Sequence, residues 1–343
     1  MNKLEISDKP ILVTGTAGFI GFHLAWRLLR EGHKVVGIDM VNDYYDVNLK
    51  EDRLKLLGEF GNFTFYRFNF MDKERLFECF ETHGFDYCVN LAAQAGVRHS
   101  LTHPQDYVDY NITAFLNILE ACKKYGIKHL IYASSSSVYG ANTKLPFSVR
   151  DNIDHPVSLY AVSKKTNELM AHAYSVNYDI PTTGLRFFSA YGPWGRPDMA
   201  LFIFATKMLN DEPIDVYNHG DMLRDFTYID DILEGICRLL PNPSLPDPQW
   251  NSDKPNPSTS FGPYRIFNIG NNSPVQLMDF IHAIEHEIDR KAQINYLPLQ
   301  IGDVPQSFAD ASELEDAVGY KPQTTVAYGM KQFMKWFREY YNL

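Results

Sequence analysis

The residue pair with the clearest chemical potential is Tyr160 and Lys164, which stand four positions apart. On a helix, this spacing puts both side chains on one face, where they can reach the same ligand atom. A free phenol has a pKa of about 10, and a neighbouring cation favours its ionised form. Tyr160 could therefore act as a base near neutral pH, with its pKa lowered by Lys164. Because both residue types are common, an ordinary helix face is the alternative.

Other polar and small residues stand where predicted strands end. Four consecutive serines, residues 134–137, end one apolar, strand-like segment. Ala92 and Ala93 end a second such segment, and Asn69 lies at the end of a third. Ligands of parallel α/β sheets bind beyond the carboxyl ends of the strands, so we expect these residues to line a ligand site. For the serines, the alternative is simply a polar strand end.

A glycine-rich turn follows the apolar segment 10–14 and precedes a helical pattern that ends at Gly32. Glycines let the backbone turn tightly and approach a pyrophosphate, whose charge lies at the helix N-terminus. A tight turn that binds no nucleotide is the alternative. The predicted cofactor-binding residues of the turn are Gly15, Gly18, Phe19, Ile20 and Gly21.

Asp39 ends the next strand-like segment, at about the 20-residue distance that a dinucleotide-binding fingerprint requires. Its carboxylate can accept hydrogen bonds from both ribose hydroxyls and would repel a 2′-phosphate. No arginine stands beside it in the chain. The pattern therefore predicts NAD rather than NADP as the cofactor.

Strand-like and helix-like segments alternate through the first half of the chain, which predicts an α/β fold with a Rossmann, doubly wound parallel sheet. We assign residues 1–185 to an NAD-binding domain, to which a helix over 226–240 returns. The alternation then weakens, and 186–343 is expected to be mainly a smaller C-terminal α/β lobe that binds substrate. Within it, 241–263 is rich in proline, serine and asparagine, which predicts a solvated loop without regular structure.

Two further helices are expected. One covers 104–126. The other covers 275–288 and carries His282 and His286 four positions apart, which is a metal-ligand spacing. No third ligand is evident in the sequence, so no metal site is predicted.

Composition excludes several classes of protein. The 343 residues are 45% hydrophobic and carry a formal charge of −10, which argues against a nucleic-acid-binding surface. The four cysteines form no C-x-x-C pair, so neither a zinc site nor a disulfide framework is indicated, and a cytoplasmic location fits. Neither an export signal nor a run of about 18 apolar residues is evident, so we expect no membrane association.

The motifs TGTAGFIG, SSSSVYG, YAVSK and RFFSAYGP occur in this order, and with them the chain resembles an extended short-chain dehydrogenase/reductase acting on a nucleotide sugar. More narrowly, VNDYYDVNLK, AAQAGVRHS, YGPWGRPDMALF, FTYIDD and GDVP resemble the UDP-glucuronate 4-epimerases. The resemblance covers the chain apart from 241–263. It implies tightly held NAD, a UDP-sugar substrate, and a homodimer formed by the helix that carries Tyr160 and the helix before it.

The resemblance also implies a catalytic trio, which falls on Ser135, Tyr160 and Lys164. Ser135 would hydrogen-bond O4 of the sugar and stabilise the ketone oxygen. Tyr160 would take the O4 proton, while Lys164 would hold the nicotinamide ribose. Related dehydratases carry Asp and Glu at the next two positions, and related decarboxylases carry a Glu at the second. Here both are serine, Ser136 and Ser137, so elimination lacks its acid and base and 4-epimerisation remains.

For a uronic acid, the 4-keto intermediate is a β-keto acid that loses CO₂ unless its carboxylate is held out of the reactive orientation. The resemblance implies hydroxyl donors and one arginine for this purpose, since charge-assisted hydrogen bonds are strong and directional. A surface-loop arginine is the alternative for Arg196. The implied substrate-binding residues are Ser136, Ser137, Ser189, Arg196, the diphosphate-binding Arg224, and Gln300 and Asp303 near the nucleotide.

Some positions depart from the family pattern. Asn69 replaces the usual aspartate at the adenine, and Ser307 replaces a bulky residue, which could admit an N-acetyl group at C2. The open alternatives are therefore an epimerase of UDP-N-acetylglucosamine or its uronic acid, and a UDP-glucuronate decarboxylase. An NAD-binding regulator without activity would not need to keep Tyr160 and Lys164.

Overall fold

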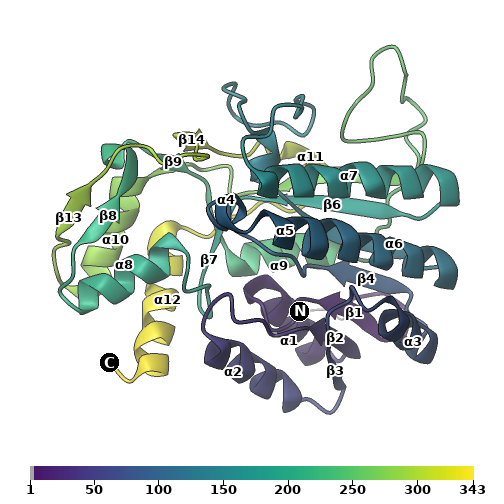
Figure 1. The fold of residues 1–343 in the computed structure, drawn as a ribbon, viewed down its shortest axis with the longest axis horizontal. Helices are drawn as coiled ribbons and strands as arrows, with labels where there is room; N and C mark the ends of the chain where they lie inside the picture. Colours follow the sequence, from purple (N-terminus) through teal and green to yellow (C-terminus); the bar gives the residue numbers. More distant parts are fainter. Residues whose placement is uncertain (1–3) are drawn as a thin grey trace.

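The computed structural model describes residues 4–343, and its centre is a seven-stranded, wholly parallel sheet (Figure 1). The first three residues of the 1–185 assignment lie outside the described residues. The strand order is β11-β6-β5-β4-β1-β2-β3, so the order reverses beside β1. This confirms the predicted doubly wound α/β fold. The strands are β1 (Ile11–Thr14), β2 (Val35–Asp39), β3 (Phe63–Arg67), β4 (Tyr87–Asn90), β5 (His129–Ser135), β6 (Thr182–Phe187) and β11 (Tyr264–Ile269).

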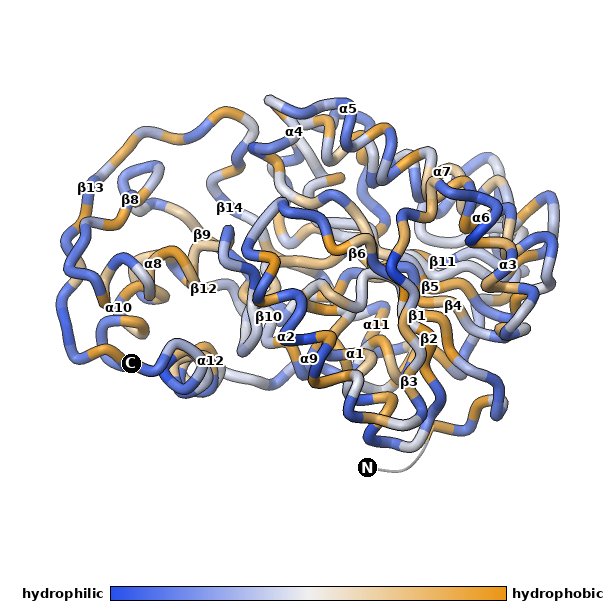
Figure 2. Tube along the Cα trace, turned by 60° about the horizontal axis from the view of Figure 1, so that its bottom comes forward, coloured by the Kyte–Doolittle hydropathy of each residue, from blue (hydrophilic) through white to orange (hydrophobic). Residues whose placement is uncertain are grey.

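Helices cover both faces of the sheet because successive strand residues point to opposite sides. Ile11 and Val13 of β1 belong to one hydrophobic cluster and Leu12 to another, and all three are fully buried. The central strands are largely hydrophobic, as both faces require (Figure 2). The first face packs against α1 (Phe19–Arg30), α9 (Ile229–Leu239) and α11 (Ser312–Val318), and α2 (Val47–Gly58) lies beside α1. The second face packs against α3 (Lys73–His83), α6 (Ala114–Tyr125) and α7 (Leu159–Tyr178).

The helix predicted over 104–126 is confirmed as an unbroken helical run over 104–125, but its winding changes within the run. It consists of α5 (Pro104–Tyr107), a π-helical turn η1 (Val108–Thr113) and α6, and a short α4 (His99–Thr102) precedes it. The wide turn leaves the carbonyl of Asn111 free to accept from Asn167 Nδ2 at 2.6 Å. The Asn111 side chain donates to Ser163 Oγ at 2.9 Å. Both are contacts with α7, so the wide turn lies where this helix packs against its neighbour.

A smaller lobe lies beside the carboxyl ends of the strands and contains the C-terminus (Figure 1). Its helices α8, α10 and α12 pack against one another, and their apolar residues join the cluster beneath α1. The two parts of the molecule therefore share one core. The elements of this part are β7 (Ser189–Tyr191), α8 (Ala200–Leu209), β8 (Ile214–Val216), the 3₁₀ turn η3 (Tyr217–Gly220), β9 (Leu223–Arg224), β10 (Phe226–Tyr228), β12 (Val275–Gln276), α10 (Leu277–Ile288), β13 (Ile294–Tyr296), β14 (Gln306–Ser307) and α12 (Val326–Tyr341).

Two elements of the sheet region were not predicted from the sequence. One is α2, whose residues are largely charged and show little amphipathic pattern. The other is β11, which pairs with β6 along its whole length and completes the sheet after a long excursion of the chain.

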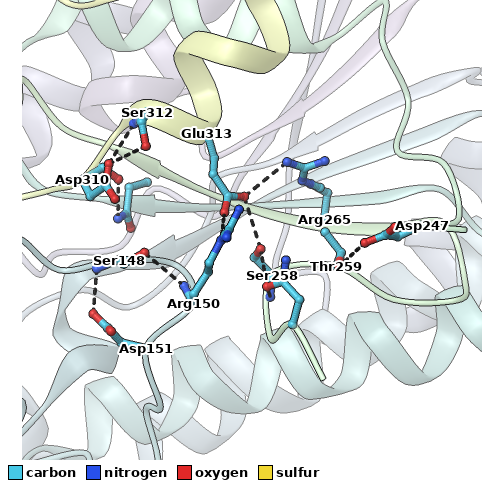
Figure 3. Close-up of polar contacts among 12 residues, drawn as sticks. Ser148, Arg150, Asp151, Asp247, Ser258, Thr259, Arg265, Asp310, Ser312 and Glu313 are labelled. Atoms are coloured by element: carbon cyan, nitrogen blue, oxygen red, sulfur yellow. Dashed lines mark hydrogen bonds and ion pairs between the residues drawn. The ribbon is translucent and has the colours of Figure 1, made fainter. Parts of the chain in front are cut away.

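The proline-rich segment 241–263 forms no helix or strand, as predicted, but it is not solvated throughout. Its middle is exposed, whereas Ser258 is fully buried. Glu313 accepts hydrogen bonds from Ser258 Oγ at 3.3 Å, from Arg265 Nη2 at 3.2 Å and from Arg150 Nε at 2.7 Å (Figure 3). This carboxylate therefore anchors the end of the segment to α11 and β11.

Candidate active site

A cavity of about 900 Å³ opens at the carboxyl ends of the strands, between the sheet and the smaller lobe. Such a crevice, at the point where strand order reverses, is where open α/β sheets bind ligands. All the residues predicted for cofactor, catalysis and substrate line this one cavity. They are Gly15, Gly18, Phe19, Ile20, Gly21, Asp39, Asn69, Ala92, Ala93, Ser135, Ser136, Ser137, Tyr160, Lys164, Ser189, Arg196, Arg224, Gln300 and Asp303.

The glycine turn between β1 and α1 leaves no room for side chains. Gly15 has a φ of +75°, and a Cβ there would lie 2.9 Å from the backbone nitrogen of Ala92. A Cβ on Gly21 would lie 2.1 Å from the carbonyl oxygen of Gly15. The turn therefore exposes bare backbone at the N-terminus of α1. This cradle fits the pyrophosphate of a dinucleotide.

Asp39, at the end of β2, lies beside the turn. Its carboxylate accepts from the backbone nitrogens of Val41 at 2.8 Å and Ala17 at 3.1 Å, which fixes its orientation. Burial raises its pKa, while these bonds and the charges of Lys50 and Arg53 oppose the rise. The carboxylate retains acceptor capacity for ribose hydroxyls.

No arginine is close to Asp39 in the sequence, as predicted. In the folded chain, however, Arg53 lies near enough for its charge to act on the pKa of Asp39. Arg53 is fully buried and donates to the carbonyl of Ala17 at 2.7 Å and to that of Trp194 at 2.6 Å. Arg53 is not among the residues that line the cavity, so its buried guanidinium does not reach a 2′-phosphate there. Lys50 also lines the cavity and was missed. Lys50 ends the VNDYYDVNLK motif that carried the family resemblance, and that motif was the signal that could have found it.

The catalytic candidates meet where β5 ends and α7 begins. Ser158 caps α7 by accepting from the nitrogen of Ala161 at 3.1 Å, and the helix then presents Tyr160 and Lys164 to the cavity. Ser135 is the last residue of β5, and its hydroxyl hydrogen-bonds the Tyr160 phenol. The serine and the tyrosine of the expected trio are thus neighbours in the folded chain.

Ser135 and Arg196, rather than Lys164, are the groups that lower the pKa of Tyr160 in this structure, and the expected electrostatic role of Lys164 stays a prediction. Burial raises the pKa of Tyr160, and the groups that oppose the rise are Ser135 and Arg196. Lys164 donates to the carbonyl of Ala133 at 2.9 Å, and burial lowers its own pKa to about 7. Desolvation is the largest cause of the pKa shift at both residues.

The loop that follows β7 is held by side chains from the nucleotide-binding part. Arg53 binds the carbonyl of Trp194, and His23 on α1 lies 2.9 Å from the carbonyl oxygen of Pro193. The loop delivers Arg196 to the cavity with 20% of its side chain exposed. The surface-loop alternative for Arg196 is therefore wrong.

Arg196 does not reach the cavity as a lone cation. Its Nε and Nη2 donate to the two carboxylate oxygens of Asp198, at 3.0 and 2.5 Å. Tyr44 donates to the same carboxylate at 3.3 Å. Sequence reasoning assigned no role to Asp198 or Tyr44, although both occur within motifs that carried the family resemblance.

Ser136 and Ser137 directly follow β5, whereas Arg224, Gln300 and Asp303 lie on the smaller lobe. Arg224 Nη2 donates to Asp303 Oδ1 at 3.0 Å, and Arg224 Nη1 donates to the carbonyl of Pro305 at 2.8 Å. The side-chain oxygen of Gln300 is buried and has no hydrogen-bond partner within residues 4–343. Ser307 is 8% exposed and also lines the cavity. The smaller-lobe end of the cavity therefore offers a ligand the Arg224 cation and the unpartnered acceptor oxygen of Gln300.

Comparison with known proteins gives consistent results. Residues 11–270 match the model of the NAD dependent epimerase/dehydratase family. The chain is 56% identical to Protein CapI of Staphylococcus aureus, over 97% of this chain and 99% of that one. It is 47% identical to a probable UDP-glucuronate 4-epimerase of Rhizobium meliloti, over 96% of this chain and 97% of that one.

A solved structure is similar over nearly the whole fold. It is the UDP-glucuronic acid 4-epimerase of Bacillus cereus in complex with UDP-glucuronic acid and NAD. The TM-score is 0.83 at 32% sequence identity, over 97% of this chain and all of that one. The similarity thus includes the smaller lobe as well as the sheet.

Proposed function

The chain belongs to the NAD dependent epimerase/dehydratase family, and on that premise we propose that it interconverts UDP-glucuronate and UDP-galacturonate by 4-epimerisation. The observation that carries the proposal is one cavity that joins the glycine turn to Ser135, Tyr160 and Arg196. The names of the similar proteins support the same reaction and cofactor.

The residues present fit NAD. We assign the glycine turn to its pyrophosphate, Asp39 to the adenosine ribose, Asn69 to the adenine, and Lys164 to the nicotinamide ribose. When bound, NAD⁺ supplies a hydride acceptor for C4 and a positive charge that lowers the pKa of a nearby phenol. Since burial raises the pKa of Tyr160, such a cation is what the base requires.

Tyr160 removes the proton from the C4 hydroxyl and later returns one. Ser135 donates to the developing ketone oxygen. Ser136 and Ser137 lie beside it and offer hydroxyls rather than carboxylates, so the chain provides no acid and base there for loss of water. Inversion at C4 requires the keto sugar to present its other face before reduction.

Ser136, Ser137, Ser189 and Arg196 are the proposed partners of the substrate carboxylate. Hydrogen bonds from these donors fix the C5–C6 bond away from the perpendicular to the ketone plane, and so suppress loss of CO₂. Arg224 is the proposed partner of the diphosphate, with Gln300 and Asp303 at the nucleoside end.

A second candidate is an epimerase of a UDP-N-acetylhexosamine or its uronic acid. Ser307 favours it, because this small side chain lines the cavity where a bulky one would exclude a C2 acetamido group. Comparing turnover of the gluco and N-acetylglucosamine forms of each substrate separates the two candidates.

We also propose that the enzyme is a homodimer formed by α6 and α7. These adjacent helices expose Leu116, Val162 and Leu169, and Leu169 is 61% exposed. Light scattering should give a dimer mass for the wild type and a monomer mass for Leu169→Glu. Leu245→Glu, at an exposed position of the proline-rich segment, should remain dimeric.

We place the enzyme in the cytoplasm, because all four cysteines are unpaired thiols that a reducing compartment preserves. Among residues 4–343, no helix has the length and apolar character needed to cross a membrane.

The decisive experiment incubates purified enzyme with UDP-glucuronate and follows the configuration at C4 by NMR, together with CO₂ release. We expect UDP-galacturonate, little CO₂, and loss of turnover in Tyr160→Phe. Stoichiometric pentose would show a decarboxylase instead, and binding of NAD without turnover would show a regulator.

A further inference from the structure

Asp198 occupies one of the two edges by which Arg196 could bind a carboxylate in a fork. Its oxygens take Nε and Nη2, which is the bidentate arrangement of strong arginine–carboxylate pairs. The other edge, formed by Nη1 and the second hydrogen of Nη2, is not part of this pair and is left for a ligand. A carboxylate that reaches Arg196 is thus limited to one edge.

Tyr44 holds this pair from the nucleotide-binding part of the molecule. Its hydroxyl donates to Asp198 Oδ2, and its ring centroid lies 5.8 Å from the Arg196 guanidinium carbon. The side chains of Arg196 and Asp198 are only 20% and 28% exposed, so solvent screens the pair weakly. Burial opposes ionisation of Asp198, yet Arg196 holds its pKa below the usual value, so it stays a carboxylate.

The pair is close to neutral overall, which is unusual for a site that receives an anion. If attraction alone mattered, a lone arginine would bind the substrate carboxylate more tightly. A fixed carboxylate beside it reduces this attraction and restricts the orientation of the guanidinium. The Arg196–Asp198 pair therefore favours a fixed orientation of the guanidinium over a high affinity for the substrate carboxylate.

We propose that Asp198 is a positioning residue that orients Arg196, and that it thereby sets how the 4-keto uronate divides between epimerisation and loss of CO₂. The inference rests on the proposed function. In the side reaction, the C5–C6 bond breaks and CO₂ leaves. Its electron pair forms an enolate with the C4 oxygen, and the enolate takes up a proton at C5. Only an Arg196 that is fixed in orientation keeps the C5–C6 bond away from the reactive geometry.

The test is Asp198→Asn, assayed with UDP-glucuronate labelled in its carboxyl group. The amide keeps the shape but loses the charge and one acceptor. We expect the CO₂ released per epimerisation to rise about tenfold, while KM for UDP-glucuronate stays equal or falls because repulsion is removed. A merely structural role would lower turnover without changing this ratio.

Three controls make the result decisive. Asp211→Asn removes an exposed partner of Arg290 outside the cavity and should leave the ratio at its wild-type value. Tyr44→Phe removes only the outer hydrogen bond to Asp198 and should raise the ratio by about threefold, which keeps the proposal testable if Asp198→Asn does not fold. UDP-glucose has no carboxylate, and its epimerisation should change equally little in both variants.

A wild-type ratio in folded Asp198→Asn, or in Tyr44→Phe if only that variant folds, would overturn the proposal. Failure of the proposed function is seen separately, since the wild type would then form no UDP-galacturonate.

Discussion

Arg186 and Glu168 form a bidentate ion pair in the interior, directly beneath the catalytic residues. Nε and Nη2 of Arg186 each donate to the carboxylate at 2.9 Å, and the two side chains are 1% and 5% exposed. Ser134 donates to the same carboxylate at 2.6 Å. Arg186 lies on β6, Glu168 on α7 and Ser134 on β5. Glu168 therefore fixes the helix that carries Tyr160 to β6 through Arg186, and to the strand that carries Ser135 through Ser134.

Glu168→Gln should destabilise the protein strongly, because it leaves the Arg186 charge buried without a counter-ion. The expected loss in the free energy of unfolding is about 3–5 kcal/mol, measured by denaturant titration. The matched control is Glu51→Gln, which breaks the exposed pair with Arg67 and should cost only about 0–1 kcal/mol. Equal losses in the two variants would contradict the importance of burial.

Gly21→Ala should release NAD. The added Cβ would lie 2.1 Å from the carbonyl oxygen of Gly15, so the turn must shift away from the pyrophosphate. We expect retention of NAD through purification to weaken by about tenfold or more, quantified by chromatography after denaturation. Gly58→Ala, where the Cβ meets no atom within 4 Å, should retain NAD like the wild type. Full retention by Gly21→Ala would refute the assignment of the turn.

Ser135→Ala should move the pH dependence of turnover to higher pH. The Ser135 hydrogen bond lowers the pKa of Tyr160, so its removal raises that pKa further. The phenolate base is then populated only at higher pH, and the rising limb of kcat/KM against pH shifts upward. Loss of rate at every pH with an unchanged profile would mean that Ser135 stabilises the ketone oxygen without tuning the base.

Arg196→Ala should impair uronate turnover far more than turnover of a neutral sugar. A charge-assisted hydrogen bond contributes about 1.5–3 kcal/mol, so kcat/KM for UDP-glucuronate should fall by about 10- to 150-fold. For UDP-glucose the loss should stay within about fivefold. Arg290→Ala, which removes a cation 49% exposed outside the cavity, should affect neither substrate. Equal losses on both substrates would mean that Arg196 only supports the loop.

Features set by local spacing were predictable from the sequence. A strand, a glycine turn and a helix must follow one another closely to form a dinucleotide cradle, and Gly15, Gly21 and Asp39 satisfy that spacing. Tyr160 and Lys164 share a helix face for the same reason. The alternation of elements was likewise sufficient to predict the parallel sheet.

Contacts between distant segments were not predictable in this way. Arg53 and Trp194 are 141 residues apart, yet their hydrogen bond links the glycine turn to the loop that carries Arg196. The π-helical turn within 104–126 likewise depends on Asn167, 56 residues away.

The sequence by itself determined which chemical groups are present and which of them are neighbours along one element. Only the tertiary structure decided the pKa values and the net charge of these groups. Burial raises the pKa of Tyr160 and lowers that of Lys164, and Asp198 neutralises Arg196. Desolvation and pairing depend on everything packed around a group, and the spacing of residues along the chain does not record that surrounding.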